Sequence, residues 1–77
     1  MQSSHELYDE LKQNHEFERR LVLMIEERKM QMDKASPAKA QKLNLEILST
    51  HARLGRCRKA ISATEDKIQQ VEKQQLR

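Results

Sequence analysis

Two seven-residue hydrophobic repeats that meet at Ser36-Pro37 limit what this chain can fold into more than any other feature. In each repeat, apolar residues recur in alternating steps of three and four, which is the pattern of a coiled-coil seam. The first seam consists of Leu7, Leu11, Asn14, Glu18, Leu21, Ile25, Arg28, Met32 and Ala35. The second seam consists of Ala40, Leu43, Ile47, Thr50, Leu54, Cys57, Ile61, Thr64, Ile68, Val71 and Gln75. Most positions in both seams are apolar, so the sequence predicts two long helices.

Start signals precede both helices. Ser3 followed by Glu6 matches a capping box, in which the serine hydroxyl accepts from the Glu6 amide and the Glu6 carboxylate reaches back. Pro37 disfavours helical geometry at Ser36, but Ser36 is a good cap and proline suits the first position of a new helix. We therefore expect one domain over residues 1–77, with a helix at about 4–34, a turn at about 35–36 and a second helix at about 37–74.

The short break and the charge pattern indicate how the helices pair. A connection of two or three residues joins antiparallel neighbours. Residues 5–18 carry five acidic residues against one basic residue, whereas residues 47–64 carry four basic residues and no acidic one. Folding the chain at residues 34–37 sets these segments opposite each other. The predicted fold class is all-α, a two-helix antiparallel coiled-coil hairpin.

Apolar residues that lie off the seams predict an association surface. Residues 21–25 are all apolar and cover the whole circumference of a helix, and a second apolar stripe lies off the seam of the second helix. Ile68 and Val71 are expected near or beyond the end of the first helix, where something else covers them. The predicted partner-binding residues are Leu23, Met24, Met30, Leu45, Leu48, Ala52, Ile68 and Val71. A chain of 77 residues buries little surface alone, so we expect a homodimer that forms a four-helix bundle, or docking of a partner helix.

The basic cluster Arg53, Arg56, Arg58 and Lys59 raises the question of nucleic acid. These positions spread around the helix, no aromatic residue stands among them, and acidic residues lie opposite. The net charge of +3 is mild. The pattern favours solvated or paired charges over an acidic protein partner, and it disfavours nucleic acid or anionic lipid.

The sequence does not indicate a metal-binding site or a catalytic nucleophile. His15 and His51 could meet across the hairpin, but a zinc site needs three or four ligands. Cys57 lies on the seam and is interpreted as a buried thiol in a reducing cytoplasm or nucleus. The longest apolar run, residues 21–25, is too short for a membrane span, and no secretory signal is visible. We expect no cofactor, no metal, no membrane contact and no enzymatic activity.

Three polar residues, Asn14, Glu18 and Arg28, interrupt the first seam. Polar seam residues can fix the register of a coiled coil at a cost in stability. They can equally mark a place where the seam shifts and Phe17 and Met24 take over the core. The sequence favours the shift.

The predicted function is a non-enzymatic protein-protein interaction and oligomerisation module that serves as an intracellular scaffold. In length and topology the chain resembles the antiparallel coiled-coil fingers of Rho-effector proteins, which present a helical face to a small GTPase. That resemblance implies a recognition finger as the alternative function. A nucleic-acid-binding helix pair ranks third.

Overall fold

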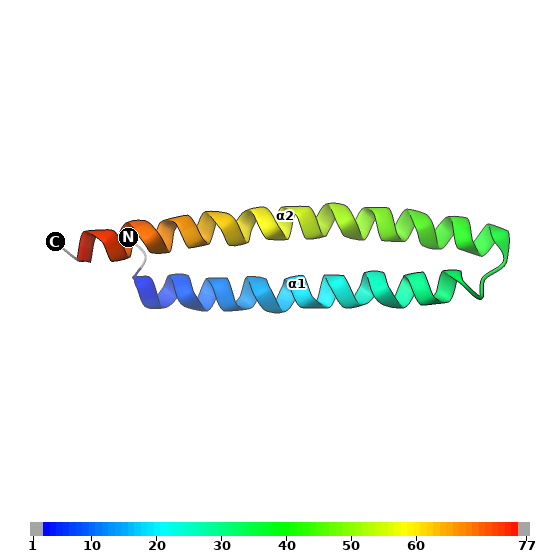
Figure 1. Cartoon of the computed structure of the whole chain (residues 1–77), viewed down its shortest axis with the longest axis horizontal. Helices are drawn as coiled ribbons and strands as arrows, with labels where there is room; N and C mark the ends of the chain where they lie inside the picture. Colours follow the sequence, from blue (N-terminus) through cyan, green and yellow to red (C-terminus); the bar gives the residue numbers. More distant parts are fainter. Residues whose placement is uncertain (1–2, 76–77) are drawn as a thin grey trace.

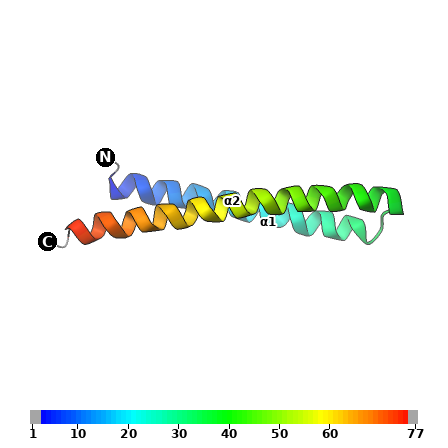
Figure 2. The same cartoon turned by 90° about the horizontal axis from the view of Figure 1, so that it is seen from above.

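Two antiparallel helices form the computed structural model, which describes residues 3–75 (Figure 1). Helix α1 spans Ser4–Met32 and helix α2 spans Pro37–Gln75. The beginning of α1 and the end of α2 lie at the same end of a rod that measures 61 × 15 × 15 Å. Figure 2 shows the helices crossing at a shallow angle. The predicted all-α helical hairpin is confirmed.

Serine side chains cap both helix starts, as predicted. The Ser3 hydroxyl accepts a hydrogen bond from the Glu6 amide at 3.3 Å. The Ser36 hydroxyl accepts one from the Lys39 amide at 3.4 Å, and Pro37 occupies the first helical position of α2. Each bond satisfies an amide that has no partner within its own helix.

The first helix ends two residues before the predicted boundary. Its last residue is Met32, and the turn covers residues 33–36. The amides of Lys34 and Ala35 bond to the carbonyls of Gln31 and Met32, each at 3.2 Å. These bonds span three residues rather than four, so the chain tightens and leaves the α-helix before it reaches the proline.

The core is a single apolar strip between the helices, and it follows the predicted seams. All nine buried apolar residues occupy seam positions, and they are Leu7, Leu21, Ile25, Leu43, Ile47, Leu54, Cys57, Ile61 and Ile68. Leu11, Val22, Met24 and Met32 pack against this strip while partly exposed. The heptad register read from the sequence is therefore the register of the fold.

Polar groups within the α2 seam are satisfied locally. The Thr50 hydroxyl donates to the Glu46 carbonyl at 2.8 Å, and the Thr64 hydroxyl donates to the Ala60 carbonyl at 3.0 Å. Each threonine hydroxyl donates to a backbone carbonyl one turn earlier in its own helix, so both buried hydroxyls have a hydrogen-bond partner. The buried Cys57 thiol donates across the seam to the Asn14 carbonyl at 3.3 Å.

The favoured seam shift in α1 is wrong for Phe17, whereas Met24 packs against the core while partly exposed. Phe17 stays 42% exposed, while Asn14, Glu18 and Arg28 remain half-buried at their seam positions. The shift is unnecessary because long side chains at the seam reach partners at its edge: Glu18 bonds Arg58, and Arg28 bonds Glu46.

The expectation that Ile68 lies uncovered is also wrong. Ile68 is 6% exposed and Val71 is half-buried. The first turns of α1 reach this far along α2, as the hydrogen bond from the Tyr8 hydroxyl to the Glu72 carboxylate shows. Ile68 is therefore covered by α1 itself, whereas the last turn of α2 extends past the start of α1 (Figure 1).

Leucines two residues apart on α1 provide a test of the core. Leu21 is 1% exposed and Leu23 is 51% exposed. Leu21→Ala should lower the free energy of unfolding by about 2–5 kcal/mol because it opens a cavity in the strip. Leu23→Ala should change it by about 0.5 kcal/mol or less. Urea denaturation followed by circular dichroism measures both, and equal losses would contradict the assigned register.

Gly55 provides a test of the outer surface of α2. A Cβ atom added at Gly55 would meet nothing within 4 Å. Gly55→Ala should therefore raise the free energy of unfolding by about 0.5–1 kcal/mol, since alanine loses less backbone entropy in a helix. Ala63→Gly at an exposed site of the same helix should lower it by a similar amount. A destabilised Gly55→Ala protein would show that something packs closely over this position.

Candidate functional site

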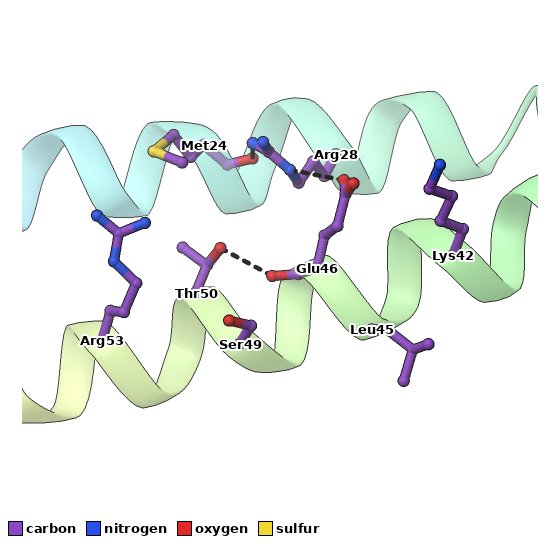
Figure 3. A pocket seen from close by; sticks show the side chains of 8 residues that line it. All are labelled: Met24, Arg28, Lys42, Leu45, Glu46, Ser49, Thr50 and Arg53. Atoms are coloured by element: carbon purple, nitrogen blue, oxygen red, sulfur yellow. Dashed lines mark hydrogen bonds and ion pairs between the residues drawn. The ribbon is translucent and has the colours of Figure 1, made fainter.

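An open groove runs along one side of the hairpin, between its middle and the turn (Figure 3). We call it the basic groove. Two residues of α1 and six of α2 line it, and they are Met24, Arg28, Lys42, Leu45, Glu46, Ser49, Thr50 and Arg53. The floor contains seam residues, so the groove is positioned by the same heptads that build the core.

Ion pairing inside the basic groove is incomplete. Arg28 Nε donates to Glu46 Oε2 at 3.1 Å, and an Arg28 Nη1 donates to the Met24 carbonyl at 3.4 Å (Figure 3). Glu46 is the only acidic residue among the eight that line the groove. Lys42 and Arg53 form no ion pair with any residue in the described part of the chain. The groove thus contains two cations that are not engaged in an ion pair within residues 3–75.

Arg53 makes a different contact. Its guanidinium carbon lies over the Phe17 ring, 5.8 Å from the ring centroid. This distance is within the range of a cation–π interaction. Phe17 comes from α1 and is 42% exposed, so a solvent-accessible aromatic ring and an arginine meet at the end of the basic groove.

The cations of the groove continue along α2. Lys39, Lys42, Arg53 and Arg56 fall on one stripe of three- and four-residue steps that also passes through Glu46 and Ser49. We call these four cations the basic edge. All four are exposed. The sequence interpretation missed this stripe because it treated Arg53 and Arg56 as part of a local run, although the spacing was visible.

The other side of the hairpin is closer to neutral. Arg58 Nε donates to Glu18 Oε2 at 3.0 Å, and His15 Nδ1 lies 3.1 Å from Glu18 Oε1. The hydrogen bond from Arg58, followed by that from His15, lowers the pKa of Glu18 below its ordinary value of 4.5. Nearer the open end, the hydrogen bond to Glu72 raises the pKa of Tyr8. The predicted charge complementarity is confirmed at Arg58, but the other three cations of that cluster make no ion pair among the described residues.

The two histidines do not meet. His15 contacts Glu18, whereas His51 lines a separate groove with Val22, Ile25 and other residues. Within residues 3–75, no group of three histidine, cysteine, aspartate or glutamate side chains is arranged to hold a metal ion.

The predicted partner-binding residues do not form one surface. Leu23, Met30, Leu45, Leu48 and Ala52 are exposed, whereas Met24 and Val71 are half-buried and Ile68 is buried. Leu45 points away from α1 in Figure 3, and Leu23 and Met30 occupy the position opposite the seam on α1. Because the exposed leucines of the two helices face outward in different directions, one partner helix cannot cover all of them. Partner binding by these residues stays a prediction.

Comparison with protein-family models identifies the wider context. The model for primosomal replication protein PriC matches residues 1–72. The chain belongs to this family. No curated protein and no solved structure matches it.

Family membership corrects the predicted function. A general coiled-coil scaffold or oligomerisation module is wrong, and so is a finger for a small GTPase, because a primosomal replication protein acts in DNA replication. The nucleic-acid relation that the sequence interpretation ranked last is the one that the family supports. The intracellular location agrees with a primosomal role. Neither described helix is long and apolar enough to cross a membrane.

The lowered pKa of Glu18 predicts an acid-sensitive contribution to stability. A depressed carboxyl pKa stabilises the fold above the ordinary value, and this stabilisation is lost as pH falls through the folded-state pKa. Glu18→Gln should therefore lower the melting temperature slightly at pH 7. Between about pH 5 and pH 3 the melting temperature of this variant should then fall less than that of the unmodified protein. Glu16→Gln, two residues away at a site without an ion pair among the described residues, should keep the pH dependence of the unmodified protein. An unchanged pH dependence in Glu18→Gln would contradict the assignment.

Proposed function

We propose that this hairpin acts in DNA replication restart as a non-catalytic primosomal protein, and that its basic groove and basic edge bind the phosphate backbone of DNA. The observation that carries the proposal is the pairing of family membership with the unneutralised cations of that one side. The cytoplasm is the proposed location.

The spacing of the charges suits a backbone ligand. From Lys39 to Arg56 the basic edge covers eighteen residues, or about 25 Å along the helix axis. A phosphate chain that follows this edge meets cations at both ends and the Arg28–Glu46 pair in the middle. Cations bound to phosphates release counterions, which gives affinity without sequence preference.

The groove contributes shape as well as charge. Ser49 and Thr50 are small, and the Thr50 hydroxyl is occupied by the Glu46 carbonyl. Neither side chain competes with a ligand for the cations on the rim. Arg28 is already held by two hydrogen bonds, so its guanidinium is preorganised rather than free.

Protein contacts belong to the same proposal, since a primosomal protein works with others. Leu45 and Leu48 are 67% and 57% exposed on α2. A surface of this kind suits a protein partner. Association of two copies, as the sequence predicts, would use Leu48, which lies outside the groove lining, together with Leu45, which belongs to it.

Charge reversal on the basic edge tests the DNA-binding proposal. Lys39→Glu combined with Lys42→Glu should weaken binding of a fluorescein-labelled oligo(dT) by about tenfold or more at low salt, because two cations become repulsive anions. The slope of log affinity against log salt should fall as well. Fluorescence anisotropy measures both quantities.

A matched control separates local from overall charge. Lys12→Glu combined with Arg19→Glu changes the net charge by the same amount on α1, at exposed positions away from the basic groove. This protein should bind the oligonucleotide within about twofold of the unmodified chain. Equal losses in both double variants, with helicity intact by circular dichroism, would overturn the assignment to the groove side.

A further inference from the structure

Phe17 is an aromatic residue that the core does not use. It is 42% exposed and lies outside the cluster of buried residues. The chain has only two aromatic residues, and the other, Tyr8, is engaged with Glu72 near the open end. An exposed phenylalanine at the end of a groove with unneutralised cations is therefore a feature that hairpin packing leaves unexplained.

We propose that Phe17 and Arg53 together form a stacking site for an unpaired nucleobase, so that the basic groove holds the phosphates and this pair holds a base of the same strand. The inference rests on the proposed function and adds to it a base-contacting subsite with named residues. Arg53 lies over the Phe17 ring and also lines the groove, which joins the two parts of the site.

The chemistry of the pair suits a flat, polarisable ligand. Phenylalanine rings and arginine guanidinium groups are the planar surfaces on which proteins stack unpaired bases. The cation–π contact restrains Arg53 before any ligand binds. No carboxylate among the described residues forms an ion pair with Arg53, so its guanidinium remains available for a base on one side and a phosphate oxygen on the other.

The geometry selects a single strand. In a duplex the faces of the bases are covered by their neighbours, and only the edges are accessible from the grooves. A single strand can turn its bases outward while its backbone follows a row of cations. Arg53 lies eleven positions after Lys42, about 16 Å along α2, which leaves room for phosphates on the groove and a base at its end.

An oligonucleotide without bases distinguishes this site from simple phosphate binding. Two labelled probes of equal length are compared by fluorescence anisotropy, oligo(dT) and an abasic deoxyribose-phosphate chain. The unmodified protein should bind oligo(dT) more tightly than the abasic chain. Phe17→Leu should weaken oligo(dT) binding by about fivefold or more and leave abasic binding within about twofold, because it removes a stacking surface and no charge.

Rescue and control variants complete the design. Phe17→Trp should restore oligo(dT) binding, since it restores an aromatic surface, while Tyr8→Leu on the other side should leave the ratio between the two probes unchanged. Equal affinity of the unmodified protein for both probes would overturn the stacking site while phosphate binding stands. Failure to bind either probe would overturn the proposed DNA binding itself. If Phe17→Leu loses helicity, Phe17→Trp is used in its place. A Phe17→Trp protein that binds both probes equally would also overturn the stacking site.

Discussion

The apolar seam between α1 and α2 is the contact on which every other feature of this molecule depends. It fixes the register of two helices that have no other packing partner among the described residues. Phe17 and Arg53 are 36 residues apart in sequence and meet because the seam holds Leu21 and Leu54 in one core cluster. The basic groove follows from the same register, since its floor includes a seam threonine. A slip of one helical turn would dismantle the core and the site together.

The helical hairpin could be predicted because its determinants are local and periodic. Seam spacing gave the helices, and Ser36 and Pro37 gave the break. The positions of the polar seam residues were harder to predict, since the free-energy cost of burying a polar side chain depends on partners elsewhere in the fold. Glu18 and Arg28 stay at the seam because Arg58 and Glu46 lie within reach at its edges. No property of α1 alone reveals that compensation, which explains why the sequence favoured a seam shift that the fold does not make.

The side that we propose to bind DNA could not be found from the net charge, because a value for the whole chain hides local differences in ion pairing. A net charge of +3 suggests a mild surface, but ion pairing removes charge unevenly. Arg58 forms an ion pair with Glu18 on one side, whereas Lys42 and Arg53 on the other side form none with any residue between 3 and 75. The sequence also shows no aromatic residue near the basic cluster of α2, because Phe17 arrives from the opposite helix. Contacts between the two helices follow only once the register is known, and for the same reason the sequence did not reveal that α1 buries Ile68.

The distance of each contact from the turn has a consequence for how the hairpin opens. The turn covers residues 33–36, Arg28 and Glu46 are separated by 18 residues, and Tyr8 and Glu72 by 64. Closing a longer loop costs more chain entropy, so contacts near the turn form early and those at the open end form last. The contacts of the hairpin are therefore expected to form in order from the turn toward the open end. The basic groove lies on the turn-proximal half, where it can keep its shape while the distant ends of the two helices separate and rejoin.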